Sequence, residues 1–293
     1  MSRARLPRLK YILEAALLYG VFGCFKCLPV VWASNVGGFI GRMVGPHLGA
    51  SKKAMKNLAR AFPEKSEQER RRIMVQSWDH MGRVFAEYPH IREIAKNRVH
   101  AKNPELVDQY KNSDHGAMFI SGHIGNWEVG CATAYLNYGI EIGSAYRAPN
   151  NPWAERLLLK ARTLNGTLKS FSKSRTGGRD MMKAAQNKEN IVFLIDQKYN
   201  EGVCAPFFGH DAMTNTGFIT IAQKYDMDIV PVRIIREENV QFQLLFYPPI
   251  ATRHADGSNR DHIDILNDAH RLIESWITEY PEQWLWLHRR WKD

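Results

Sequence analysis

A histidine and a glutamate lie five residues apart in the segment SGHIGNWEVG, residues 121–130. A buried strand is expected to end at Ser121, and the two glycines that follow allow a sharp turn. This turn places His123 at the carboxyl end of the strand, where open α/β sheets carry their active sites. Asn126 can cap the next helix, so that Glu128 falls in its first turn.

His123 and Glu128 could together activate an alcohol. A carboxylate bonded to one imidazole nitrogen fixes the tautomer and stabilises the imidazolium that forms when the other nitrogen takes a proton. Such general-base assistance is worth about 10² to 10⁴ in rate. The two side chains meet only if the turn folds back, because five residues along one helix diverge by about 140°. The alternative is a capping glutamate beside a structural histidine.

Short apolar runs alternate with helical patterns after residue 112. The runs rich in Ile, Val and Phe predict strands at 117–121, 140–146, 191–196, 228–235 and 240–247. Helices are expected near 126–138, 152–165, 177–188, 216–225 and 261–279. The sequence therefore predicts an α/β fold, a single catalytic domain with a mixed sheet flanked by helices.

Residues 11–32 are nearly apolar and contain only two charged side chains, Glu14 and Lys26. They predict an N-terminal hydrophobic membrane-anchor helix ahead of the catalytic domain, either a marginal span or a segment lying on the membrane. A cleaved signal peptide and an ordinary core helix are the alternatives.

Glycines then recur at every fourth position, at Gly37, Gly41, Gly45 and Gly49. On a helix they form one smooth face that allows another backbone to approach closely. The expected organisation is an anchor and glycine-rich segment at 1–50 and a catalytic domain at 51–293, made of a basic helical pair, 51–100, and an α/β core, 101–293.

The chain has 40 Lys and Arg against 30 Asp and Glu, a net charge of +10, and its distribution is uneven. Residues 1–102 carry +12 and residues 103–293 carry −2. Anionic lipid attracts each Lys or Arg by about 1 kcal/mol, and nucleic-acid phosphates also bind clustered bases. The basic helical pair could therefore contact lipid headgroups or an acidic carrier protein, or be a solvated face. Cys24 and Cys27 form a CxxC, but it lies in an apolar segment without a second pair, so a zinc site is not expected, and nothing in the four cysteines indicates a disulfide scaffold.

The motif HIGNWE, which contains His123 and Glu128, resembles the HxxxxD/E signature of glycerolipid-type acyltransferases. Its wider context resembles the late lipid A biosynthesis acyltransferases, which add secondary lauroyl or myristoyl chains. The matching segments follow the family order through nearly the whole chain: NLARAFPE, YRAPNNP, RTGGRDMM, FLIDQ, PFFGHDAMTNTG, IVPVRI and PEQWLWLHRRWKD.

The resemblance implies a membrane-associated enzyme on the cytoplasmic face of the bacterial inner membrane. It would move an acyl chain from acyl carrier protein to a hydroxyacyl hydroxyl of a phosphorylated, Kdo-bearing lipid A precursor. His123 would be the general base and Glu128 its partner, with no metal or redox cofactor and no nucleic acid involved. The alternatives are an acyltransferase for another glycolipid or phospholipid, and a non-catalytic basic adaptor for membranes or nucleic acid.

The resemblance also implies substrate-binding residues around this pair. Arg147 could bind phosphate or stabilise a developing oxyanion, or could form a plain salt bridge at a strand end. Asp196 departs from the EGTR-like block of the wider superfamily and could position Arg147 or the sugar. The full substrate-binding set is Asn126, Arg147, Arg175, Gly177, Gly178, Asp196 and Gln197. Within this set, Arg175, Gly177 and Gly178, here called the Arg175 segment, could bind a further anionic group through backbone amides at the start of the next helix.

Overall fold

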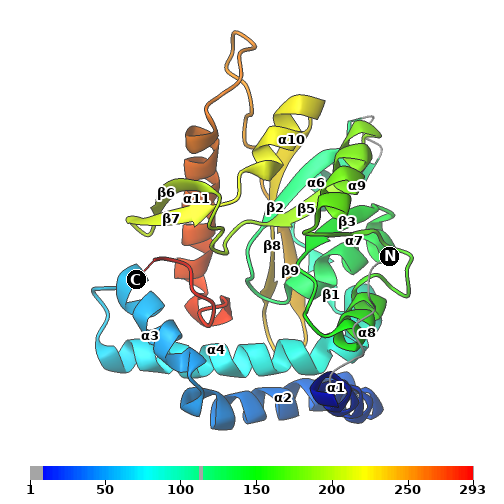
Figure 1. The fold of residues 1–293 in the computed structure, drawn as a ribbon, viewed down its shortest axis with the longest axis vertical. Coiled ribbons are helices and arrows are strands. Elements are labelled where there is room, and N and C mark those ends of the chain that lie inside the picture. The colour runs from blue at the N-terminus through cyan, green and yellow to red at the C-terminus, as the bar shows by residue number, and fades with distance from the viewer. Residues whose placement is uncertain (1–8, 112–114, 293) are drawn as a thin grey trace.

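The computed structural model describes residues 9–111 and 115–292, which are built around a seven-stranded sheet (Figure 1). The strands in sheet order are β1 (Val99–Ala101), β9 (Phe242–Phe246), β8 (Asp228–Arg236), β2 (Ala117–Ser121), β5 (Asn190–Leu194), β3 (Ile142–Tyr146) and β4 (Ser170–Ser172). Among these described strands, neighbours are parallel except β8 and β9, which are antiparallel. The predicted mixed α/β sheet is therefore confirmed.

Helices cover both faces of the sheet, which explains why its central strands are apolar at consecutive positions. In β2, Met118 and Ile120 join one buried cluster and Ala117 and Phe119 join the other, because successive side chains point to opposite faces. The first cluster includes side chains of α9 (Arg175–Gln186), α10 (Gly217–Tyr225) and α11 (His262–Glu279). The second includes side chains of α5 (Ile91–Asn97), α6 (Pro104–Lys111) and α7 (Gly130–Tyr138), and partly buried side chains of α8 (Pro152–Arg162) pack against it.

A separate antiparallel hairpin packs against α11. It consists of β6 (Val203–Phe207) and β7 (His210–Thr214), and the sequence patterns did not predict it. Phe207 at its tip is fully buried against Trp284 and Trp291 of the C-terminal segment, which follows a short 3-10 turn, η4 (Pro281–Gln283). The C-terminal segment therefore belongs to the core and reaches the end of the sheet that carries His123.

The N-terminal part of the chain forms α1 (Leu9–Cys27), α2 (Val30–Val44), α3 (Ala50–Ala61) and α4 (Glu67–Glu87), and α4 runs below the sheet with α2 alongside it (Figure 1). A capping box between Ser66 and Glu69 starts α4. A Cβ at Gly37 would lie 2.4 Å from the carbonyl oxygen of Gly82, and one at Gly41 would lie 2.1 Å from that of Trp78. The predicted close approach along the glycine face is confirmed there.

The glycine face does not extend through all four predicted positions. A Cβ at Gly45 would collide with the ring of Trp78, whereas one at Gly49 would meet open space.

The predicted membrane-anchor helix is wrong. Within residues 9–111 and 115–292, the structure contains no helix that combines the length and the apolar character required to cross a bilayer. The apolar N-terminal segment is divided between two helices at Pro29, and Glu14 and Lys26 interrupt the first of them. Part of α1 packs on the rest of the protein, with Phe22 buried between Phe85 and Tyr88.

Candidate active site

The turn after β2 carries His123 and is fixed by glycine. Gly125 has a φ of +57°, and a Cβ there would lie 1.7 Å from the carbonyl oxygen of Ile234 in β8. Only glycine fits this close approach at positive φ. His123 lies just beyond the carboxyl end of β2, and β5 runs parallel beside it, with Leu194 paired to Ser121.

Asp196 is the carboxylate that holds His123. Its Oδ1 lies 2.7 Å from His123 Nδ1, while its Oδ2 accepts hydrogen bonds from the His123 backbone N–H and from Trp284 Nε1, both at 2.7 Å. Asp196 is 3% exposed. Burial raises the pKa of this carboxyl, but the charge and hydrogen bonds of His123 and the bond from Trp284 outweigh burial and lower the pKa to about 2.

The second ring nitrogen of His123 is directed to Gln197. The amide Nε2 of Gln197 lies 3.1 Å from His123 Nε2. If Nδ1 carries the ring proton and donates it to Asp196, Nε2 has a lone pair that accepts from Gln197. This is the tautomer that a general base requires.

Glu128 contacts a different partner from the one that the sequence predicts. Arg162, the last residue of α8, donates from Nε to Oε2 and from Nη2 to Oε1 of Glu128, both at 2.7 Å. Trp127 Nε1 donates to the same carboxylate at 3.0 Å, and Arg162 Nη2 also donates to Tyr88 Oη at 2.9 Å. Glu128 therefore forms a bidentate ion pair with Arg162, and Asp196 is the carboxylate that contacts His123.

A cavity of about 260 Å³ is lined by His123 of the first pair and by both residues of the second, whereas Asp196 is buried and does not line it. His123, Gln197, Glu128 and Arg162 line its polar part. Its apolar wall is formed by residues of the sheet and of α7, among them Val192, Leu194, Val232, Ile234, Leu244 and Cys131. A small polar centre against an apolar wall suits a reacting group that carries a hydrocarbon chain.

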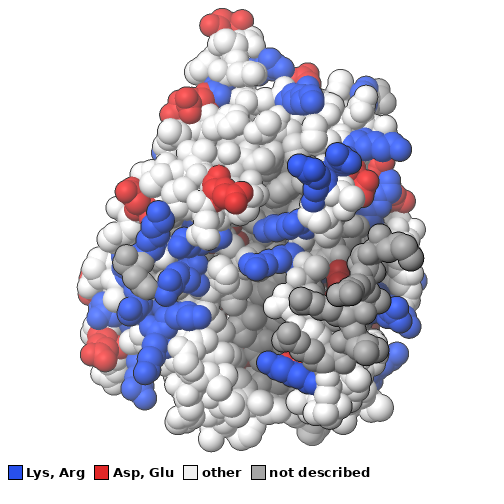
Figure 2. Space-filling view, viewed as in Figure 1, with Lys and Arg blue, Asp and Glu red and all other residues white. Residues whose placement is uncertain are grey.

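Besides Arg162, three more cations line this cavity: Arg233, which pairs with Glu279, and Arg147 and Lys173. Burial, and then the nearby charge of Arg147, lower the pKa of Lys173. Figure 2 shows Lys and Arg around a hollow in the middle of this face. The positive charges of Arg147 and Lys173, which lie near each other, favour an anionic group at this cavity.

The Arg175 segment and Asn126 do not line the cavity. At the start of α9, Ser174 accepts the Gly177 amide on its hydroxyl and the Gly178 amide on its carbonyl, so both amides are used within the helix. Asn126 is 1% exposed, and its side-chain amide donates to Glu87 instead of capping the next helix.

Arg162, Lys173 and Trp284 were not in the predicted site. No local motif marks Arg162 or Lys173, because they reach the cavity from α8 and from the loop after β4. Trp284 reaches Asp196 across 88 residues of sequence.

The structure defines an α/β protein in which a hydrogen-bonded histidine–aspartate pair lies at the end of the sheet, with the histidine lining a cavity that has an apolar wall. Residues 3–293 match the family model described as Bacterial lipid A biosynthesis acyltransferase, so this chain belongs to that family and is an acyltransferase of lipid A biosynthesis. The resemblance found in the sequence is thereby confirmed.

Similar proteins cover most of the chain. The lipid A biosynthesis palmitoleoyltransferase of Escherichia coli (strain K12) is 25% identical over 281 residues, 93% of this chain and 89% of that protein. The lipid A biosynthesis lauroyltransferase of the same organism is 27% identical over 250 residues, 81% of this chain and 77% of that protein. The crystal structure of the 1-acyl-sn-glycerophosphate acyltransferase from Thermotoga maritima aligns over 94% of this chain and 99% of that chain, with 12% identity and a TM-score of 0.41.

Proposed function

We propose that this enzyme transfers a fatty acyl chain from a carrier-protein thioester to a hydroxyacyl hydroxyl of a Kdo-bearing lipid A precursor, with His123 as general base. The observation that carries the proposal is the His123–Asp196 pair. Asp196 holds Nδ1 at 2.7 Å, and the opposite nitrogen is directed to Gln197 in a cavity with an apolar wall.

In the proposed reaction, Nε2 of His123 removes the proton of the acceptor hydroxyl as its oxygen attacks the thioester carbonyl. Asp196 stabilises the imidazolium that forms. Collapse of the tetrahedral intermediate breaks the carbon–sulfur bond, and the imidazolium returns the proton to the departing thiolate. The products are an ester and a free thiol.

Direct transfer is favoured over an acyl-enzyme formed on the cysteine in the cavity. Burial raises the pKa of the Cys131 thiol to about 12. A thiol with this pKa stays protonated at neutral pH and is a weak nucleophile. Negative charge that develops on the carbonyl oxygen would be stabilised by Arg147 and Lys173, two cations that line the same cavity as His123.

A basic surface next to the cavity supports an acidic carrier protein as donor. Lys52 and Lys53 are exposed on α3, and Figure 2 shows Lys and Arg gathered on the side where α3 and the C-terminus lie. Asn57 of α3 donates to the carbonyl oxygens of Trp286 and His288 at 2.8 Å, and the N–H of Leu285 in the same segment donates to the His123 carbonyl at 3.1 Å, so α3 is bonded to the segment that contacts the histidine. An acidic protein that docks here would present its thioester close to the cavity.

Exposed apolar side chains on α2 support association with the cytoplasmic face of the inner membrane. Trp32, Phe39 and Met43 are 68%, 56% and 59% exposed. Apolar side chains of this size are placed favourably at the boundary between headgroups and acyl chains.

The proposed function is tested with the purified enzyme, a Kdo-bearing lipid A precursor and acyl carrier proteins loaded with acyl chains of graded length. Mass spectrometry should find one acyl chain added to the precursor, and no addition to phospholipid acceptors supplied in the same way. Addition only to a phospholipid would contradict the proposed acceptor.

The donor is tested by charge reversal. Lys52→Glu/Lys53→Glu should raise KM for the acyl carrier protein donor several-fold and leave KM for the matching acyl-coenzyme A unchanged. The matched control is Lys183→Glu/Lys224→Glu on α9 and α10. Equal effects of the two double variants would contradict docking on α3.

Membrane association is tested by flotation with vesicles that contain anionic phospholipid. Trp32→Ser/Phe39→Ser/Met43→Ser should lose most vesicle binding, whereas Met182→Ser/Ile263→Ser, which also removes exposed apolar side chains, should retain it. Unchanged binding of the triple variant would contradict a role of α2.

A further inference from the structure

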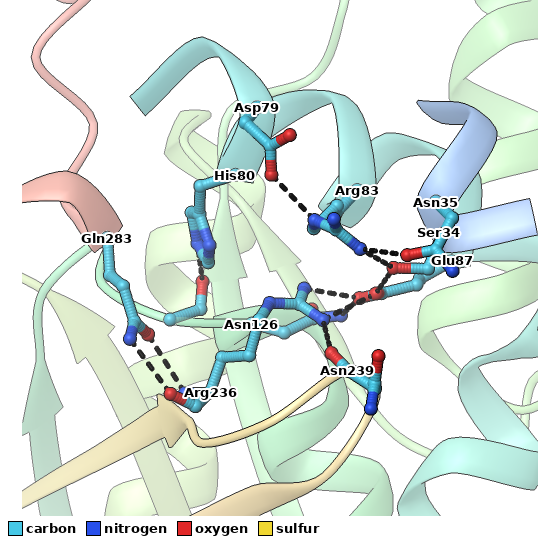
Figure 3. Close-up of polar contacts among 11 residues, drawn as sticks. Ser34, Asn35, Asp79, His80, Arg83, Glu87, Asn126, Arg236, Asn239 and Gln283 are labelled. Atoms are coloured by element: carbon cyan, nitrogen blue, oxygen red, sulfur yellow. Dashed lines mark hydrogen bonds and ion pairs between the residues drawn. The ribbon is translucent and has the colours of Figure 1, made fainter. Parts of the chain in front are cut away.

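A buried ion pair that the proposed chemistry does not use lies behind the turn that carries His123 (Figure 3). Glu87 at the end of α4 is 0% exposed. Its Oε1 accepts from Arg236 Nη1 and Ser34 Oγ at 2.7 Å each, and its Oε2 accepts from Arg236 Nη2 at 2.8 Å and Asn126 Nδ2 at 2.7 Å. Neither Glu87 nor Arg236 lines the cavity.

Arg236, the last residue of β8, is itself fixed by several contacts. Its Nη1 also donates to the carbonyl oxygen of Asn239 at 2.8 Å, and its guanidinium lies 4.6 Å from the ring centre of Phe242. The side chain of Gln283 bonds both the N–H and the carbonyl of Arg236, each at 2.9 Å. The Glu87 carboxylate is therefore held in one place and one orientation.

The same group of residues holds the turn. The Asn126 amide connects it to Glu87, the Gly125 N–H donates to the carbonyl oxygen of Gln283 at 3.1 Å, and the Gly125 carbonyl lies 3.0 Å from His80 Nε2. Burial, and then the charge of Arg236, lower the pKa of His80 to about 3. His80 is therefore neutral near pH 7, and a proton on its Nε2 donates to Gly125.

We propose that the Glu87–Arg236 pair positions the turn that bears His123, acting through Asn126. The inference rests on His123 acting as the base of the proposed function. Stability is a weak reason for such a pair, since replacing a buried ion pair by apolar side chains of similar volume is often neutral or stabilising. Position is a better reason, because a displacement of about 1 Å at a reacting group costs about 10²-fold in rate.

The Glu87–Arg236 pair is also hydrogen-bonded to α2, which connects the residues that position the turn to the N-terminal helices. Ser34 donates to Glu87, and Arg83 Nη1 donates to Asn35 Oδ1 at 2.7 Å, so α2 is bonded to the end of α4 beside the turn (Figure 3). The packing of α2 on α4 therefore contributes to the position of His123.

The first test is Asn126→Ala, which removes the connection to the turn and keeps the ion pair. We expect kcat to fall about tenfold to a hundredfold. KM for donor and acceptor should stay near the wild-type values, because Asn126 does not line the cavity. The matched control is Asn103→Ala, which removes an asparagine side chain bonded to the backbone of Phe246 and not to the turn, and which should keep wild-type kcat.

The second test separates position from stability. Glu87→Met/Arg236→Met replaces the pair by apolar side chains and leaves Asn126 without its acceptor. We expect the free energy of unfolding to remain close to wild type, and kcat to fall by the same factor as in Asn126→Ala, again with little change in KM.

Wild-type kcat in Asn126→Ala overturns the positioning role, and so does wild-type kcat in the folded double variant. If the double variant fails to fold, the result for Asn126→Ala decides alone. His123→Ala is measured alongside them. If it keeps full turnover, the proposed base has failed; if it is inactive while the positioning variants are fully active, only this inference has failed.

Discussion

Two buried carboxylates of the candidate site have partners of different chemistry: Glu128 lines the cavity, whereas Asp196 does not and contacts its lining residue His123. Asp196 holds a histidine and Glu128 holds an arginine, and each pair is joined at 2.7 Å. Burial lowers the pKa of Arg162, but the adjacent Glu128 carboxylate raises it above its usual value. Arg162 therefore keeps its proton at any working pH, whereas an imidazole can exchange one near neutrality. The partner of the carboxylate thus decides which pair can do proton chemistry.

The largest effect is expected from removing the histidine. His123→Ala should lower kcat by about 10² to 10⁴, because it removes the proposed acceptor of the hydroxyl proton. The fold should be intact by near-ultraviolet circular dichroism, since the His123 side chain is 15% exposed and lies at the cavity. Turnover above one tenth of wild type in the folded variant would contradict the general-base role.

A smaller effect is expected from neutralising the other carboxylate. Glu128→Gln keeps the size of the side chain but removes the charge opposite Arg162, and we expect about a tenfold loss of kcat/KM from the weakened charge-assisted bonds. The pH at which kcat is half-maximal should not move, because Glu128 does not hold His123. Arg162→Gln is the matched variant. A displaced pH midpoint in either variant would contradict the assignment of proton transfer to the His123–Asp196 pair alone.

The smallest effect concerns acid stability. The folded-state pKa of Asp196 is lowered from 3.8 to about 2, so the ionised carboxylate stabilises the fold above pH 3.8, and this contribution is lost as the pH falls toward 2. Asp196→Asn should therefore be less stable than wild type at pH 5 to 7, and the difference should shrink between pH 4 and pH 2. Urea unfolding across this range measures it, and a constant difference would contradict the lowered pKa.

The sequence singled out His123 and Asp196 but not the contact between them, because it predicted Glu128 as the partner of His123 and gave Asp196 a substrate-binding role. His123 and Asp196 each stand two residues beyond a strand, and those strands pair in parallel with Ser121 opposite Leu194. Local sequence patterns do not show which strands pair when those strands are far apart in the chain. Glu128, only five residues from His123, was therefore the carboxylate that the sequence predicted as its partner. The 3-10 turn at Trp127–Val129 instead directs Glu128 to Arg162, 34 residues away.

The N-terminal segment has a helical pattern of buried positions, but its long apolar run favoured the prediction of a membrane anchor. The buried positions Ala15, Phe22 and Phe25 recur at helical spacing, which is typical of a helix that packs on protein. The strands predicted in the α/β core are all present, because their apolar runs are long enough to show a pattern. The three-residue edge strands β1 and β4 are too short to be predicted in this way.

The most direct test compares Asp196→Asn with Glu128→Gln in the same assay, with kcat measured from pH 5 to 9. An asparagine at position 196 can hold the wrong tautomer of His123 and cannot stabilise its imidazolium, so kcat should fall by about 10² to 10⁴. The loss in Glu128→Gln should be at least tenfold smaller. Near-normal kcat in a folded Asp196→Asn, together with a large loss and a displaced pH midpoint in Glu128→Gln, would show that Glu128 is the acid on which His123 depends.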